Sequence, residues 1–441
     1  MTPGAFAVWF RELWRWDVKF FATRVESVFP IKELGPLIQE GGTIVRPALF
    51  PNETFKILGV TNDSGVIDAY DAEGKEINQP YQRVQAGDFV YNPYRVNVGS
   101  VGIVPQELGG HLISPAYVVF SVCEPELIPE FLLFVLQAQR FNGVLRAATA
   151  GSVRQSLTYD LLRTLKIPVP PPSEQEKLLG LIRNAQGSVS SSFEELDSVA
   201  AELDAWLTAQ TNSEVFDRPW LALDWRNLKR WDVKSARAAA FRLAHPEFVP
   251  FGTYAEEATE SVKPWQEPEK EWPVYGVNNK DGVFFSHHQR GAEFNATYKH
   301  IQRDWFFHNP TRSAVGSLGI VPEVPADALT SSEYQVWRLR DIEKNSLVPQ
   351  FVASLIRTPW FVKLIQFHRV GAVKQRLYVE NLLEIPVPRF PRQLQNRIAS
   401  ERQAALERLA KAKERAAIVK QEVEEMILGT RPVPSAHKKG N

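Results

Sequence analysis

The chain has 441 residues, of which 44% are apolar, and its 51 lysines and arginines balance 51 aspartates and glutamates. This length favours two globular domains with connectors, and no apolar run is long enough for a membrane span. Cys123 is the only cysteine, which excludes an intramolecular disulfide and a cysteine-based zinc site.

The N-terminus and the charge balance bear on location and on partners. The first residues contain no basic stretch followed by a clean apolar one, so we expect no signal peptide and a cytoplasmic protein. A neutral chain argues against nucleic-acid binding unless its charges are unevenly distributed.

Residues 1–172 have the pattern of a mixed α and β module. An amphipathic pattern predicts a helix over 128–148, and the proline-rich segment 168–172 disfavours helix and ends the module. Short β-branched runs cut by Gly, Asn and Pro predict strands within 55–70, 86–105 and 111–122.

A long helix is predicted over 173–212. It begins at Ser173 with Glu176 three residues on, which is a capping box. Its residues recur at spacings of three and four, the heptad seam of a coiled coil: Leu178, Ile182, Ala185, Val189, Ser192, Leu196, Val199, Leu203 and Trp206. A helix packed on its own domain would give the same pattern, so both interpretations stay open for either long helix taken alone.

Residues 213–390 repeat the mixed pattern, with a helix predicted over 347–365. Strands are predicted within 272–285, 304–322 and 331–339. A second long helix over 391–428 has its own seam of Ile398, Arg402, Ala405, Leu409, Ala412, Ala416, Val419, Val423 and Met426. Residues 429–441 are predicted to form a flexible basic tail.

The second half of the chain repeats the first. Residues 92–105 return at 309–322, identical at 10 of 14 positions and 217 residues later. Three shorter segments return in the same order: RWDVK at 15–19 and 230–234, GSVRQSL at 151–157 as GAVKQRL at 371–377, and IPVPPP at 167–172 as IPVPRF at 385–390. Duplication is the economical explanation, so the function uses two similar modules.

The charges of the two long helices are complementary. The first, to Gln210, carries seven acids and two bases, and the second carries eight bases and six acids. The acids gather in the C-terminal half of the first helix and arginines near the start of the second. We therefore predict an antiparallel pair, with each rod about 50 Å long.

Taken together, these features resemble the specificity subunit of type I restriction–modification systems. The resemblance covers nearly the whole chain and is most specific in GSVRQSLTYDLLRTLKIPVPPPSEQ and its second copy GAVKQRLYVENLLEIPVPRFPRQ, each followed by a long helix. The first copy keeps Glu174 and Gln175, whereas the second has Gln393 or Gln395 with no preceding Glu.

The resemblance implies an α+β fold with two tandemly duplicated target recognition domains separated by helices that form an antiparallel coiled coil. Each domain would read one half of a bipartite double-stranded DNA sequence. The helices would set the spacing and dock two methyltransferase subunits, with restriction subunits joining the full complex. S-adenosylmethionine would belong to the methyltransferase, and this chain would bind no cofactor.

Residues shared by the repeats are expected to serve the common fold or common partners, and differing residues to read different half-sites. Arg95 and Arg312 are either phosphate contacts or parts of loop-fixing salt bridges. The differing loops include residues 61–64 against 278–281, and residues 287–290 carry donors suited to a DNA groove. The full set of DNA-binding candidates is Arg95, Asn97, Arg154, Gln155, Lys280, His288, Arg290, Arg312, Lys374 and Gln375. Trp16 and Trp231 are predicted to pack.

No catalytic constellation is evident. NPYR and NPTR begin like a methyltransferase motif but lack the second proline and the aromatic residue that would stack a flipped base. His287 and His288 are adjacent, a poor spacing for a metal pair. We predict no catalysis and no metal site, and two alternatives stay open: a coiled-coil scaffold that does not read DNA, and an unrecognised duplicated hydrolase.

Overall fold

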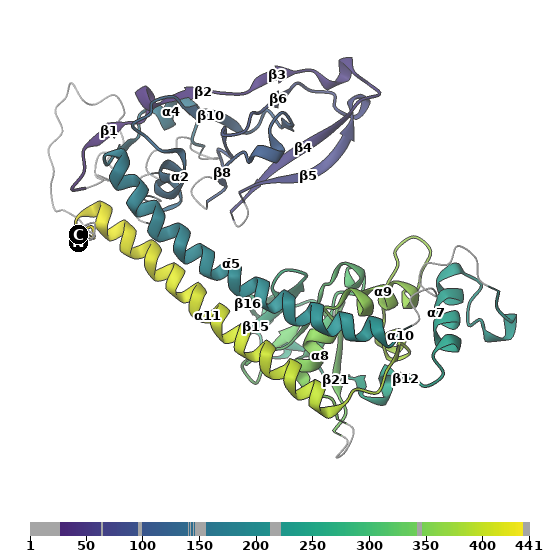
Figure 1. Cartoon of the computed structure of the whole chain (residues 1–441). Helices are drawn as coiled ribbons and strands as arrows, with labels where there is room; N and C mark the ends of the chain where they lie inside the picture. The colour runs from purple at the N-terminus through teal and green to yellow at the C-terminus, as the bar shows by residue number, and fades with distance from the viewer. Residues whose placement is uncertain are drawn as a thin grey trace. The chain divides into compact units, whose positions relative to one another are not determined.

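The computed structural model describes residues 27–62, 65–95, 99–139, 141, 143, 145, 156–211, 222–341 and 346–434. The chain forms two compact units. The first unit comprises residues 1–188 and 412–441, and the second comprises 189–411. Figure 1 shows the helices and strands of both units.

The described residues of the first unit form three sheets. A two-stranded sheet joins β1 (Ile31–Glu33) to β11 (Lys166–Pro168). A four-stranded sheet has the order β2 (Ile38–Glu40), β10 (Val118–Val122), β7 (Phe89–Tyr91), β8 (Val101–Ile103). A five-stranded sheet has the order β3 (Thr43–Val45), β6 (Tyr81–Arg83), β9 (Leu112–Ile113), β4 (Thr54–Thr61), β5 (Gly65–Glu73).

The second unit repeats these three sheets strand for strand. Its two-stranded sheet joins β12 (Val249–Pro250) to β22 (Pro386–Val387). Its four-stranded sheet has the order β13 (Ala255–Glu257), β21 (Gln335–Leu339), β18 (Phe306–His308), β19 (Leu318–Ile320). Its five-stranded sheet has the order β14 (Ser261–Val262), β17 (Tyr298–His300), β20 (Leu329–Thr330), β15 (Glu271–Asn278), β16 (Gly282–Arg290).

The match extends to irregular details of the long hairpins. The β4–β5 register shifts between Ile57 and Leu58, and the β15–β16 register shifts between Val274 and Tyr275. Both hairpins also pair with a neighbouring strand in parallel. A bulge and a parallel pairing at matching places confirm the duplication that the sequence repeat predicts.

A glycine in each repeat is explained by close packing of strands. A Cβ on Gly102 would lie 2.9 Å from the backbone nitrogen of Val66, and one on Gly319 would lie 2.8 Å from that of Val283. The strand after the repeated loop therefore presses against the tip of the long hairpin, and only glycine fits.

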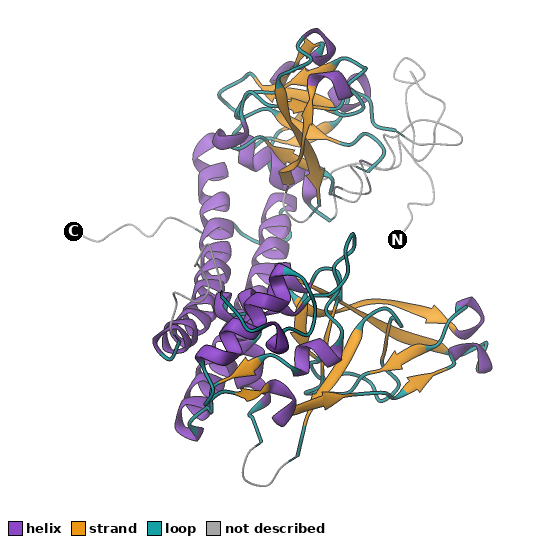
Figure 2. Cartoon of the chain, turned by 90° about the vertical axis from the view of Figure 1, so that its right-hand side faces the viewer, coloured by secondary structure: helices purple, strands orange, loops and turns teal. Residues whose placement is uncertain are grey.

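Two long helices, α5 (Pro172–Ala209) and α11 (Arg392–Leu428), contribute to both units and run side by side (Figures 1 and 2). In the first unit, the start of α5 and the end of α11 share one hydrophobic cluster that includes Leu178 and Val423. In the second unit, Leu203 of α5 and Ile398 of α11 share another. The predicted antiparallel pairing is confirmed within each unit, and every predicted seam residue is buried or half-buried.

Ion pairs follow the predicted charge pattern. The Arg408 Nε lies 2.5 Å from a Glu195 carboxylate oxygen, and Arg397 pairs with Glu202. The acidic end of α5 therefore meets the basic start of α11 inside the second unit.

A buried glutamine anchors the start of each long helix. The Gln175 amide accepts a hydrogen bond from the Ile128 backbone nitrogen at 2.8 Å and donates to the carbonyl of Pro170 at 2.7 Å. Gln395 does the same with Val348 at 3.2 Å and Phe390 at 3.0 Å. Gln395, not Gln393, is thus the counterpart of Gln175, and both have a structural role.

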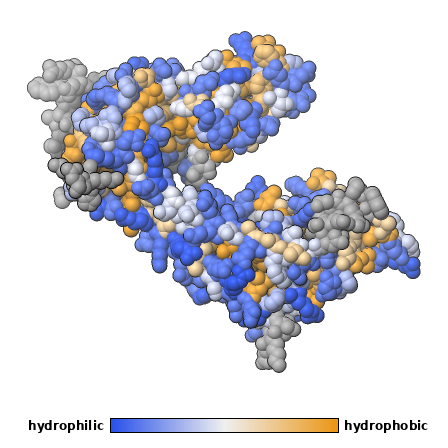
Figure 3. Space-filling model, in the orientation of Figure 1, coloured by the Kyte–Doolittle hydropathy of each residue, from blue (hydrophilic) through white to orange (hydrophobic). Residues whose placement is uncertain are grey.

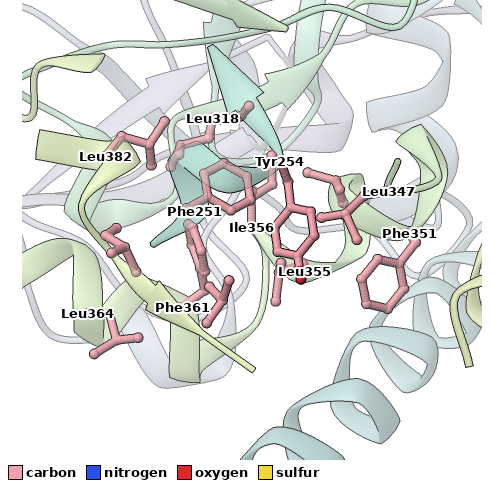
Figure 4. Packing of buried hydrophobic residues seen from close by; sticks show 14 of the residues in the cluster. Phe251, Tyr254, Leu318, Leu347, Phe351, Leu355, Ile356, Phe361, Leu364 and Leu382 are labelled. Carbon is pink, nitrogen blue, oxygen red and sulfur yellow. The ribbon is translucent and has the colours of Figure 1, made fainter. Parts of the chain in front are cut away.

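Several short helices complete the units. They are α2 (Pro129–Gln137), α4 (Tyr159–Arg163), α7 (Val233–Ala244), α8 (Pro349–Leu355), α9 (Pro359–His368) and α10 (Val379–Leu383). In the second unit, α7, α8, α9 and α10 pack with the helix pair and the four-stranded sheet around one core. Phe251, Tyr254 and Phe361 belong to this core (Figure 4). The Trp337 and Phe306 rings stack at 4.4 Å within it.

Three predicted elements are each divided in the structure. The helix expected over 128–148 is interrupted because Ala138 is extended. The helix expected over 347–365 is split at Thr358, whose hydroxyl oxygen caps α9 and whose neighbour Pro359 cannot continue α8. The strand expected over 111–122 becomes β9 and β10, which belong to different sheets.

The described part of the chain has no helix long and apolar enough to cross a membrane. The face in Figure 3 mixes hydrophilic and hydrophobic areas.

Candidate nucleic-acid interface

The tip of the β15–β16 hairpin is shaped by one asparagine. The Asn278 Oδ1 accepts hydrogen bonds from the backbone nitrogens of Lys280 at 2.9 Å and Asp281 at 2.6 Å. A side-chain oxygen that binds the backbone two and three residues on is a common means of closing a turn. The turn leaves Asn279 and Lys280 exposed at the tip.

The repeated NPxR loop is held by its asparagine. The Asn309 Oδ1 accepts from the backbone nitrogens of Thr311 at 3.0 Å and Arg312 at 3.3 Å, and the Asn92 Oδ1 accepts from Tyr94 at 3.0 Å. Arg95 and Arg312 are exposed and form no ion pair with another described residue. The side chain of Asn309 therefore fixes the loop, and the guanidinium of Arg312 remains available to a ligand.

The repeated GAVKQ turn packs against this loop. The Leu377 nitrogen donates to the Pro310 carbonyl at 2.9 Å, as Leu157 does to Pro93 in the first unit. The Arg369 Nη2 donates to the carbonyls of Gln375 at 2.8 Å and Thr311 at 3.2 Å, which ties the turn to the loop. Lys374 projects from the turn and is exposed.

The repeated RWDVK segment joins the same surface at the start of α7. Asp232 caps α7 by accepting from the Ser235 nitrogen at 2.9 Å, and it pairs with Arg230 at 3.0 Å. The Lys234 ammonium donates to the Gln375 side-chain oxygen. Burial lowers the pKa of Lys234, and the neighbouring charge of Arg369 lowers it further.

Trp231 does not pack as predicted. Its side chain is 83% exposed, because the segment is held by polar capping contacts and not by its tryptophan. Trp16, its counterpart, lies outside the described residues.

In the second unit, hydrogen bonds connect the segments that carry four of the candidates: Lys280, Arg312, Lys374 and Gln375. The link between the hairpin tip and the loop is Arg357, which donates to the carbonyls of Lys280 and Gly316. We call this edge, made of residues 278–282, 309–317, 371–376 and 230–234, the cationic edge.

Two other candidates lie away from the cationic edge. His288 and Arg290 stand on β16 roughly 20 Å and 26 Å along the strand from the hairpin tip, at about 3.3 Å per residue. Arg290 pairs with Glu269, and His288 packs its ring 4.9 Å from Phe285. Asn97, Arg154 and Gln155 lie outside the described residues, so the first unit is compared only through Arg95.

Sequence reasoning missed Lys234, Arg357 and Arg369. The sequence does indicate Lys234, since it recurs as Lys19 in the repeated RWDVK segment. No sequence pattern indicates Arg357 and Arg369, because they lie at a helix break and a helix end whose contacts depend on the fold.

The outer strands of the two hairpins differ in chemistry. The β5 strand exposes Asp68 and Asp71, and Asp68 pairs with Lys56 at 2.5 Å. The matching positions on β16 hold Phe285 and His288, both exposed. The shared framework therefore presents an acidic strand in one unit and an aromatic and imidazole strand in the other.

No cluster of three or more His, Cys, Asp or Glu side chains among the described residues is arranged to hold a metal ion.

No protein-family model and no curated protein matches this sequence. A chain from a study described as the structural basis of complex assembly and conformational transition of the type I R-M system is 16% identical, with a TM-score of 0.36 and coverage of 92% of this chain and 98% of that one. The HsdS subunit from Thermoanaerobacter tengcongensis is 16% identical, with a TM-score of 0.33 over 91% and 95%.

The type I restriction-modification S subunit from M. genitalium is 13% identical, with a TM-score of 0.38 over 93% of this chain and 97% of that one. At these identities and TM-scores, the likeness does not transfer a function to this chain.

Proposed function

We propose that this chain is the DNA sequence-recognition subunit of a type I restriction–modification complex, in which each module reads one half of a bipartite target. One observation carries the proposal. In the second unit, three segments whose sequences recur in the first half of the chain (309–317, 371–376 and 230–234) meet at the cationic edge with a hairpin tip, 278–282, whose sequence differs between the halves. That combination suits a ligand whose backbone is uniform and whose sequence varies.

DNA reading needs two kinds of contact, to phosphates and to bases, and these correspond to the shared and the differing residues of the two halves. Phosphates are alike at every base pair, so the cations that meet them can be retained in both modules. Base edges differ, so the side chains that read them must differ between half-sites. Arg312 and Lys374 fit the first role, and the tip residues Asn279 and Lys280 fit the second.

The helix pair has a distinct proposed role. It would set the distance between the half-sites and dock two methyltransferase subunits, one beside each repeat. Those subunits would bind S-adenosylmethionine and perform methyl transfer, restriction subunits would join the full complex, and this chain would catalyse nothing itself.

The decisive experiment is methylation of DNA by this chain together with its methyltransferase partner. Sequencing of the methylated DNA should give two short half-sites separated by a spacer of fixed length. Sequence-independent methylation, or one contiguous motif, would overturn the proposal. Nuclease activity of the purified chain alone would favour the hydrolase alternative, and assembly without sequence-selective DNA binding would favour the scaffold.

Salt dependence tests the phosphate contacts separately. Replacing Arg312 or Lys374 with Gln should weaken binding to all DNA sequences and lower the slope of log K against log salt by about 0.9 for each lost contact. Arg303 is a matched control, because it is exposed and pairs with Glu323 at the opposite end of the β18–β19 hairpin. Arg303→Gln should leave the slope unchanged.

A further inference from the structure

Arg357 lies behind the cationic edge and contacts two of its loops at once. Its Nη1 donates to the Gly316 carbonyl at 3.0 Å, and its Nη2 faces the Lys280 carbonyl at 3.4 Å. The residue is half-buried, and burial lowers its pKa, whereas the charges of Asp197 and Asp281 raise it. The guanidinium therefore faces backbone carbonyls.

A guanidinium is suited to this position. Its planar fork of N–H donors can serve two carbonyls from different segments in one fixed geometry. A lysine ammonium would retain the charge but not the planar set of donors, and a glutamine amide would retain one donor group but not the charge. The contact thus ties the hairpin tip to the loop that carries Arg312.

The other half of the chain does not repeat this arrangement. Gln137 occupies the position that matches Arg357, and its amide donates to the Val101 carbonyl at 3.2 Å, at the start of β8. Ile182 in the seam of α5 matches Arg402 in the seam of α11. Both arginines are therefore particular to the second unit.

Arg402 lies near Arg357 in the second unit. Its Nε donates to the Gln350 side-chain oxygen at 3.2 Å, in α8, the helix that ends two residues before Arg357. Burial and the nearby charge of Arg357 lower the pKa of Arg402 to about 10. A hydrogen bond thus joins α11 to the helix that precedes Arg357.

We infer that Arg357 is a positioning residue that sets recognition of the second half-site without touching DNA, by holding the hairpin tip and the 309–317 loop in one relative geometry. The inference rests on the proposed function for its DNA readout. It also has a readout that needs no DNA, because the two loops are held in the free protein.

The test compares Arg357→Lys and Arg357→Gln with the wild-type chain. Hydrogen exchange of the full chain without DNA should quicken at the amides of 278–282 and 313–317 in both variants, with other segments unchanged. In the complex with methyltransferase, discrimination between cognate DNA and DNA altered in the second half-site should fall about tenfold, as expected for the loss of charged hydrogen bonds. Discrimination at the first half-site should be retained.

The controls separate the alternatives. Arg303→Lys should change neither readout, and Gln137→Ala should leave exchange at 278–282 and 313–317 and discrimination at the second half-site unchanged. A fall in the salt slope of about 0.9 would mean that Arg357 contacts a phosphate, which would overturn the inference. Unchanged exchange in both loops, or equal losses at both half-sites, would overturn it too. If the wild-type complex shows no sequence selectivity, the proposed function fails, and the exchange measurement still decides whether Arg357 holds the loops.

Discussion

Single side chains show how the two halves keep one framework with different chemistry. Tyr91 and His308 occupy matching buried positions, and each donates to the carbonyl that follows the repeated turn. The Tyr91 hydroxyl reaches the Leu157 carbonyl at 3.0 Å, and the His308 Nε2 reaches the Leu377 carbonyl at 3.0 Å. The shared requirement is a ring with a donor at its end, so the position accepts either residue.

His308 makes the second unit sensitive to acid. Burial lowers its pKa to about 4, from an ordinary value near 6.5 in the unfolded chain. Because the pKa of His308 is lower in the folded state, its neutral imidazole contributes fully to the free energy of unfolding above pH 6.5. This contribution is lost as the pH falls toward 4, by about 3 kcal/mol in total. His308→Tyr should remove most of this loss and keep the Leu377 contact.

Thermal unfolding at pH 7.5 and pH 5 checks this expectation. His308→Phe is the control, since it should also remove the pH dependence but lose the hydrogen bond and melt lower at both pH values. His368 is also buried, and burial lowers its pKa, so it should contribute a pH dependence of the same sign that both variants retain. An undiminished pH dependence in both variants would contradict the assignment to His308.

The buried glutamines at the starts of the long helices should be costly to remove. Gln175→Ala or Gln395→Ala leaves buried backbone groups without partners, at about 1–3 kcal/mol for each unsatisfied group. Denaturant unfolding should show a clear loss of stability for either variant. Gln393, which is exposed, provides the control: Gln393→Ala should change little. Equal effects of Gln393→Ala and Gln395→Ala would refute the structural role.

At the scale of elements, the seam and not the ion pairs should stabilise the helix pair. Leu203 of α5 is fully buried in the cluster that it shares with Ile398 of α11, so Leu203→Ala should cost about 2–5 kcal/mol. The Glu195–Arg408 pair is exposed, so Glu195→Ala should cost less than about 1 kcal/mol. Chemical denaturation measures both, and a larger loss for Glu195→Ala would reverse the expected ranking.

The sequence predicted elements where the pattern was long and local. The seams of α5 and α11 recur over many turns, so their burial and antiparallel sense were predicted from apolar spacing and charge. The breaks at Ala138 and Thr358 were missed because the apolar pattern continues through them. Only Pro359 offered a local warning.

The candidate site was predicted in part for a similar reason. Arg312, Lys374 and Lys280 come together because repeated segments share a surface, which a repeat can indicate. The separation of His288 and Arg290 from that surface depends on hairpin length and strand pairing. The contacts of Arg357 and Arg369 join segments distant in the chain, and no spacing pattern records them.

At the scale of the whole molecule, the two modules and the helix pair have separate proposed roles. Each module has the same sheets and the same loop-fixing asparagine, and the exposed hairpin tips differ, so we assign the difference in DNA reading to the tips. In this proposal, changing a tip alters one half-site, and changing the helices alters only the distance between half-sites.

Replacing residues 278–281 tests the modules. The substitution alters a turn closed by Asn278, so the replacement should keep Asn278 and exchange only Asn279 and Lys280 for other polar residues. The methylated motif should then change in one half-site alone. A change in both half-sites would exclude the assignment of one reader to each module.

Lengthening the helix pair tests the spacer. Seven residues inserted after Val189 in α5 and after Ala412 in α11 keep the seam in phase to within about 20°, so the helices should still pair. Each insertion adds about 10 Å of helix, which corresponds to roughly three base pairs at 3.4 Å per step. Sequencing of methylated DNA should therefore give the same two half-sites with a longer spacer. An insertion in α5 alone shifts the seam against α11 and should reduce stability and activity together. If the doubly extended chain methylated different half-sites at the original spacing, the helices would not be the element that sets the distance.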